Sequence, residues 1–124
     1  MTYALGKRSL ERLVGVHPDL VRVVKRAIEL TDHDFSVIEG LRTIETQRAY
    51  VAKGASKTMN SRHITGHAVD LYPVGRPTPW DKCPVVAKAM PAAADELGVA
   101  IAWGGSWKSF VDQPHFELLR SKYP

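Results

Sequence analysis

The strongest periodic pattern in the chain lies between residues 17 and 31. Apolar residues recur there at the spacing of one helix face, with basic residues between them: Leu20, Val24, Ala27 and Ile28. His17-Pro18-Asp19 stands at its start, where proline suits a first helical turn and aspartate is favourable at the positive end of the helix dipole. We therefore expect a helix from this tripeptide to about Thr31.

Two later stretches also have helical patterns. Thr43 can cap a helix through IETQRAYVAK, which Gly54 would end. The segment 80–97 is helical in pattern; we expect Pro91 to kink or split this helix and Gly98 to end it. Two polar, glycine-containing segments are predicted loops: 54–61 and 104–110.

Between the helices lie four short segments rich in β-prone residues. They are predicted strands: 35–38, 67–72, 99–103 and 115–119. Side chains alternate along a strand, so Asp70 and Tyr72 should share one face of the second strand, and His67, Val69 and Leu71 the other. The irregular alternation of helices and strands predicts an α+β fold with a small, mostly antiparallel sheet flanked by helices.

Length and composition are those of one globular domain, which we expect to span residues 1–124. The chain has 124 residues, of which 44% are hydrophobic and 24% charged. Its apolar runs are too short to cross a bilayer, and its N-terminus lacks the pattern of a signal peptide, so we expect synthesis in the cytoplasm and no membrane insertion. The single cysteine, Cys83, is expected to be a packed small side chain.

The net charge of +4, from 17 basic and 13 acidic residues, suits an anionic partner such as nucleic acid, a membrane surface or a cell wall. The basic residues are scattered, however, which is typical of the solvated faces of helices. Only Arg62 lies next to the histidines described below. A dedicated nucleic-acid site or a metal-dependent nuclease is therefore the less favoured hypothesis.

The stretch SRHITGHAVD, residues 61–70, contains two of the five histidines. Asp70 lies inside a predicted half-buried strand, where a carboxylate is costly unless a metal ion or an arginine pairs with it. Downstream, His115 would complete a set of two imidazoles and one carboxylate with His63, which suits zinc with one position open to water. Spacing alone leaves hydrogen-bonded histidines as an alternative, and His67, on the opposite strand face, is not expected to be a ligand.

These motifs together resemble a known family. SRHITGHAVD fits Ser-x-His-x-x-Gly-x-Ala-x-Asp and DQPHF fits Asp-x-x-His-Phe, while EGLRTIETQ and WGGSW are similar to two further family elements in the same order. The resemblance is to the zinc D-alanyl-D-alanine carboxypeptidases and L-alanyl-D-glutamate endopeptidases, with their hedgehog-like fold, and to the bacteriophage endolysin branch in particular. It covers the chain from about Val37 to Glu117.

The resemblance implies one zinc ion per chain, bound by His63, Asp70 and His115. It also implies that Asp112 is the general base and that Arg42 faces the substrate carbonyl or the developing oxyanion. Residues that would support the ligands or contact substrate are Ser61, Gln47 and Trp103, the last of which could equally be a core or cleft-wall residue. From residue type alone, Arg42 could instead pair with Glu39 or Glu45 on the surface, and Asp112 could cap a turn before Pro114.

The function implied is that of a phage endolysin: hydrolysis of a stem-peptide amide in peptidoglycan by attack of zinc-bound water. The L-alanyl-D-glutamate bond is the expected target, and a bond to meso-diaminopimelate or D-alanine, as in a D,D-carboxypeptidase, is the alternative. Such a protein would stay in the host cytoplasm until lysis. It would act on the wall as a monomer with a single catalytic domain, 1–124, and no separate wall-binding domain. The alternative is a non-catalytic, zinc-stabilised module of the same fold that binds wall peptide or another protein. That alternative requires a closed four-ligand site, with His67 or Glu117 as the fourth ligand.

Overall fold

A computed structural model describes residues 2–56, 58–107 and 111–124 of the protein. Its elements follow one another along the chain as α1 (Lys7–Arg12), α2 (Pro18–Leu30), β1 (Phe35–Glu39), α3 (Ile44–Ala52), β2 (Ala68–Pro73), η1 (Trp80–Lys82), α4 (Cys83–Leu97), β3 (Ile101–Trp103), η2 (Gly104–Ser106) and β4 (His115–Leu118). The fold is therefore α+β, as the sequence predicts. No helix within the described residues has the length and apolar character of a membrane span.

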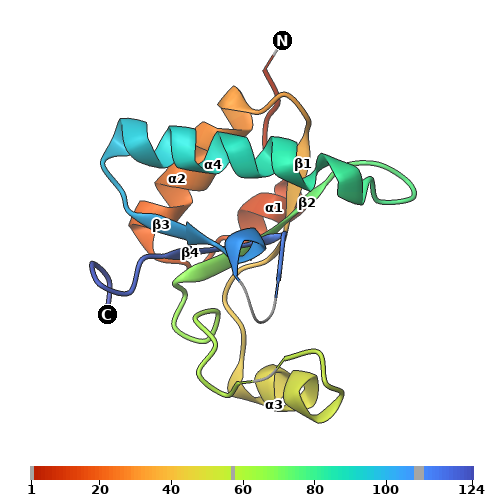
Figure 1. Ribbon diagram of the computed structural model, residues 1–124, viewed down its shortest axis with the longest axis vertical. Coiled ribbons are helices and arrows are strands. Elements are labelled where there is room, and N and C mark those ends of the chain that lie inside the picture. Colours follow the sequence, from red (N-terminus) through yellow and green to blue (C-terminus); the bar gives the residue numbers. More distant parts are fainter. Residues whose placement is uncertain (1, 57, 108–110) are drawn as a thin grey trace.

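The strands form one antiparallel sheet in the order β1-β2-β4-β3. Helices α2 and α4 pack together against it, whereas α3 and its flanking segments form a lobe on the far side of the sheet (Figure 1). The central pair, β2 and β4, brings Asp70 directly opposite His115, although 45 residues separate them in sequence. The sheet thus joins the two motifs that the sequence analysis singled out.

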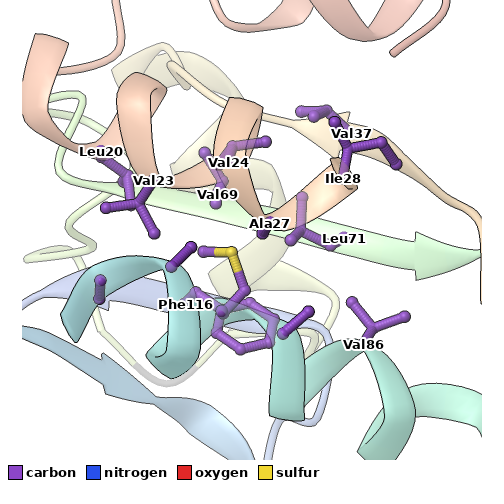
Figure 2. Close-up of a cluster of buried hydrophobic side chains, with 14 of the residues drawn as sticks. Leu20, Val23, Val24, Ala27, Ile28, Val37, Val69, Leu71, Val86 and Phe116 are labelled. Atoms are coloured by element: carbon purple, nitrogen blue, oxygen red, sulfur yellow. The ribbon is translucent and has the colours of Figure 1, made fainter. Parts of the chain in front are cut away.

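The core lies between the sheet and helices α2 and α4 (Figure 2). Val69 and Leu71 of β2 and Phe116 of β4 are at most 1% exposed and belong to the same core cluster as the buried apolar residues of α2 and α4. Side chains alternate along a strand. Asp70, between Val69 and Leu71, and His115, next to Phe116, therefore point to the other face, toward the α3 lobe. Burial of one face therefore fixes which side chains the opposite face presents.

The expected elements are present, with ends that shift by one or two residues. The helix expected from residue 80 begins with the short 3-10 helix η1 and continues as α4, which contains Pro91 without being split. Pro91 is on the exposed side, while Met90 and Ala93 on either side of it are fully buried, so packing holds the helix together across the missing hydrogen bond. Helix α1 is too short for its periodicity to stand out in the sequence.

Cys83 is 3% exposed at the start of α4, as expected for a packed side chain. The structure describes parts of the two predicted loops, 54–61 and 104–110. In the second loop, Gly104–Ser106 form the 3-10 helix η2. Residues 57 and 108–110, which belong to these two loops, lie outside the described residues.

Candidate metal centre

His63 is held by a tight turn between α3 and β2. Its backbone N–H donates to the Ser61 hydroxyl at 3.2 Å, and Gly66 closes the turn with a positive φ of 76°. A Cβ atom on Gly66 would lie 2.4 Å from the carbonyl oxygen of Gly15, so only glycine fits this approach. The imidazole of His63 is 2% exposed, and its Nδ1 is 2.8 Å from the carbonyl oxygen of Gly40.

Asp70 lies between the two histidines. Its Oδ1 is 3.2 Å from Nε2 of His63 and 3.3 Å from Nδ1 of His115. The other ring nitrogen of His115 is 2.8 Å from Oε1 of Glu117, which is 8% exposed and lies two residues further along β4, on the same strand face. The sheet and the turn therefore present two imidazole nitrogens and one carboxylate oxygen to one point.

These three residues fit a metal ion. One ligand atom from each of His63, Asp70 and His115 lies within 4.8 Å of the other two. Within the described residues, these three form the one cluster of histidine, cysteine and acidic side chains close enough to bind a single metal ion. The Gly40 carbonyl and the Glu117 carboxylate can accept from the outer nitrogen of each ring. Each ring in its neutral form would then keep its proton on the outer nitrogen, and the inner nitrogen would offer its lone pair to a metal ion. Two neutral imidazoles and a carboxylate are a donor set that zinc favours.

Without a metal ion, the centre is strongly polarised. Burial alone would raise the pKa of Asp70, but hydrogen bonds from His115 and His63 hold it well below its ordinary value. Burial opposes a charge on His115, yet its hydrogen bonds to Asp70 and Glu117 raise its pKa to about 9. The carboxylates of Asp70 and Glu117 thus favour a positive charge between them, either on a protonated His115 or on a bound metal ion.

Arg42 lies at the side of this group. One of its nitrogens is 3.9 Å from Oδ2 of Asp70, and its side chain is only 8% exposed. It pairs with Glu39 and donates to Oε1 of Gln47 at 2.6 Å, while the Ser61 hydroxyl is 3.4 Å away. Pairing with Glu39 was one of the alternatives open from sequence, but the pair is in the cleft wall and not on the outer surface.

Local structure explains how Arg42 is held. A register shift in β1 between Val37 and Glu39 places Glu39 opposite Asp70. Gln47 is completely buried in α3, whose N-terminus is capped by Thr43, and the Arg42 guanidinium is 4.6 Å from the centre of the Tyr50 ring. Contacts on several sides therefore fix the guanidinium in one orientation.

Asp112 enters the cleft from the loop before β4. Its backbone N–H donates to the Gly104 carbonyl at 3.0 Å, and its own carbonyl accepts from His115 N–H at 3.1 Å. Burial and the nearby Asp70 carboxylate raise the pKa of Asp112 above its ordinary value. A carboxylate of raised pKa beside the ligands, and not one of them, is suited to accept and release a proton.

The two tryptophans of this loop have different surroundings. Trp103 packs against the core, and its indole N–H donates to the Gln113 carbonyl at 2.7 Å, which braces the loop that carries Asp112. Trp107 lines the cleft, with its ring centre 4.9 Å from that of His115. His67 lies away from the metal group, with its Nδ1 2.6 Å from the Thr65 hydroxyl.

The centre is at the floor of an open cleft of about 790 Å³ between the sheet and the α3 lobe. Sequence reasoning considered Glu117 as the fourth ligand of a closed site, and it gave no role to two other cleft residues, Tyr50 and Arg120. The spacing His115-x-Glu117 on a strand was a usable signal, because two residues apart on a strand share a face. Contacts such as that of Tyr50 with Arg42 depend on tertiary structure and leave no local pattern.

A buried His-Asp-His group in an open cleft, with a separate carboxylate and an arginine beside it, is the arrangement of metal-dependent hydrolases. Comparisons with known proteins place the chain among peptidases. Residues 1–119 match the family model of the phage L-alanyl-D-glutamate peptidases. The chain belongs to this family, and it is a peptidase.

Individual relatives agree with this membership. The L-alanyl-D-glutamate peptidase of Escherichia phage T5 is 34% identical over 130 residues, which cover 99% of this chain and 94% of that protein. A peptidase of the same name from Listeria phage A118 is 40% identical over 93 residues, covering 70% of this chain and 31% of the longer relative. The crystal structure of the Serratia marcescens L-Ala D-Glu endopeptidase ChiX superposes with a TM-score of 0.88 at 46% identity, covering 95% of this chain and 91% of that one.

Proposed function

We propose that the protein is a zinc-dependent endolysin that hydrolyses the L-alanyl-D-glutamate bond of the peptidoglycan stem peptide. The observation that carries this proposal is the buried group of His63, Asp70 and His115, open to a cleft, in a chain of this peptidase family. One zinc ion per chain would be held by these three residues. When bound, zinc supplies a water molecule of pKa about 7 and a positive charge for the substrate carbonyl.

In this proposal, Asp112 is the general base. Its carboxylate takes a proton from the attacking water and passes it to the departing nitrogen of the D-glutamyl residue. Its raised pKa brings it closer to the range in which both transfers are favourable. The hydrogen bonds that join its backbone to Gly104 and His115 keep it beside the metal ligands.

Arg42 stabilises the substrate carbonyl oxygen as charge develops on it. The guanidinium is already desolvated and fixed by Glu39 and Gln47, so it needs no reorganisation when the oxygen becomes negative. Ser61 supports both sides of the site, since its hydroxyl accepts from the backbone of His63 and lies 3.4 Å from Arg42. Trp103 acts at a distance, through the loop that carries Asp112.

We further propose that this single catalytic domain works as a monomer on the wall, after release from the host cytoplasm at the end of the phage cycle. The alternative of a non-catalytic binding module requires a fourth protein ligand. In the described structure, His67 precedes β2 and lies against Thr65 and His17, and Glu117 binds the outer nitrogen of His115. Both candidates for that fourth position are therefore engaged elsewhere.

The test uses purified peptidoglycan with mass spectrometry of the released peptides, for the wild type and the Asp112→Ala variant. Zinc content is measured in both. The proposal predicts one zinc in each, with new glutamyl amino termini released by the wild type only. One zinc in each with no cleavage by either protein would establish the binding module instead.

A further inference from the structure

The bond that the protein cleaves brings a negative charge into the cleft. D-Glutamate has two carboxyl groups, of which at most one continues the peptide, so the residue that follows the scissile bond carries a second carboxyl that is free. This carboxyl is ionised at neutral pH unless it is amidated. A cleft lined by Glu39, Asp70, Asp112 and Glu117 repels such a group unless a cation receives it.

Three arginines line the described part of the cleft, and two of them are already engaged. Arg42 pairs with Glu39 and Gln47. Arg62 is 8% exposed, and its Nη2 donates to the carbonyl oxygens of Leu118, at 3.2 Å, and Tyr123, so it fastens the C-terminal segment. Neither guanidinium can turn to a substrate without losing buried contacts.

Arg120 differs from both. Its side chain is 64% exposed at the cleft edge, just after β4. Its Nε lies 3.9 Å from Oε2 of Glu117, beyond hydrogen-bond distance, and its Nη2 is 3.5 Å from the carbonyl oxygen of Asn60. The guanidinium therefore retains donors that can turn into the cleft.

The position of Arg120 relative to the metal centre suits this task. Glu117 links the two, since its Oε1 is bonded to His115 and its Oε2 faces Arg120. A guanidinium can bind a carboxylate with two parallel hydrogen bonds, and a flexible arginine at the cleft edge can reach a group a few bonds from the scissile amide.

We propose that Arg120 is the specificity-determining residue that binds the free carboxylate of the D-glutamyl residue. This inference rests on the proposed L-alanyl-D-glutamate activity and adds to it a preference between two wall chemistries. Substrates with a free D-glutamyl carboxylate are bound better than their amidated counterparts, because the amide cannot form a charged pair with the guanidinium. The effect falls on KM, since the carboxylate is bound equally in the substrate and in the transition state.

The experiment compares two synthetic stem peptides that differ only in this group, carboxylate or carboxamide, with wild type, Arg120→Gln and Lys122→Gln. Lys122→Gln is the matched control, because it removes the same charge from an exposed residue two positions away. We expect wild type and Lys122→Gln to cleave the carboxylate peptide about tenfold or more better in kcat/KM, as a charged hydrogen-bonded pair provides. Arg120→Gln is expected to cleave the two peptides with similar kcat/KM, through a higher KM for the carboxylate peptide.

Two results overturn the inference. One is a preference that persists in Arg120→Gln, and the other is an equal loss on both peptides. Failure of the wild type to cleave either peptide while it releases other fragments from intact wall contradicts the proposed bond instead. Circular dichroism spectra of the three proteins establish that the variants are folded.

Discussion

At the scale of single residues, the two histidines of the centre are oriented by different partners. A backbone carbonyl, that of Gly40, accepts from His63, whereas a carboxylate, that of Glu117, accepts from His115. A carboxylate makes the imidazole a stronger electron donor to a metal ion than a neutral carbonyl does. Metal affinity should therefore depend on a residue that is not itself a ligand.

The Glu117→Gln variant tests this dependence. The amide keeps the size of the side chain but removes its charge, so we expect affinity for zinc to fall about 10- to 100-fold. Titration against a chromophoric chelator measures the affinity, and Glu11→Gln, at an exposed position of α1, is the control. Unchanged affinity in Glu117→Gln would show that the hydrogen bond to His115 does not tune the centre.

Sequence reasoning reached the residues that carry recognisable chemistry. His63, Asp70 and His115 were identified because their types and order are informative, and the structure brings them together. It did not find how Arg42 is held, because Gln47 and Tyr50 reach it from a helix whose position depends on the whole fold. Contacts that form only after folding have no signature in local spacing.

At the scale of elements, helix α1 supports the centre through a close backbone contact. A Cβ atom on Gly40 would lie 2.1 Å from the carbonyl oxygen of Arg12, the last residue of α1, and 2.8 Å from the Val16 side chain. The Arg12 side chain adds a hydrogen bond of 3.0 Å to the carbonyl oxygen of Val37 in β1. Helix α1 and the end of β1 are thus fitted together at the residue whose carbonyl orients His63.

The Gly40→Ala variant should disturb both stability and metal binding. The added methyl group must push α1 away from β1, which we expect to lower the free energy of unfolding by about 1–3 kcal/mol, as overpacking does. Urea denaturation of the metal-free protein measures the stability, and zinc affinity is measured on the same samples. Gly6→Ala, where a Cβ meets nothing within 4 Å, is the control. Equal losses in both variants would contradict the close-contact explanation.

The C-terminal segment is fastened to α2 by a hydrogen bond. The Tyr123 hydroxyl donates to Asp19 at 2.7 Å, and this bond, followed by that from Arg22, keeps the pKa of Asp19 below its ordinary value. A carboxyl whose pKa is lowered on folding stabilises the folded state above its unfolded pKa of about 3.9, and this contribution is lost as the pH falls. The sequence predicted the Asp19 helix start but not its partner, which is 104 residues away.

Tyr123→Phe should therefore lower the melting temperature at pH 7, and the difference from wild type should shrink as the pH falls below 3. Thermal denaturation followed by circular dichroism at several pH values measures this. A difference that stays constant from pH 7 to pH 2 would attribute the effect of Tyr123 to packing against His17 instead.

At the scale of the whole molecule, the basic charge has a consequence for the wall. The net charge of +4 is scattered over the surface, whereas the cleft floor is acidic. The basic residues of the outer surface would therefore attract an anionic polymer. Salt screens this attraction, because the Debye length is only about 8–10 Å at 0.1–0.15 M salt. The binding of insoluble wall and the chemistry in the cleft are thus separable.

Added salt should accordingly slow the cleavage of whole wall more than that of a short soluble peptide. We expect the rate on purified wall to fall severalfold between 0.05 and 0.5 M sodium chloride, because surface charges are largely screened over that range. Turbidity loss of wall suspensions and chromatography of the peptide measure the two rates. Equal salt dependence for both substrates would assign the effect to the cleft.

The central claim is that one metal ion, held by His63, Asp70 and His115, is required for peptide cleavage. The most direct measurement is a zinc titration of metal-stripped protein, with bound zinc and cleavage of an L-alanyl-D-glutamyl peptide followed in the same samples. The account predicts no cleavage without metal, a linear rise, and saturation at one zinc per chain, with neither tight binding nor cleavage in His115→Ala. Full activity of the metal-free protein, or cleavage by a folded His115→Ala variant, would contradict it.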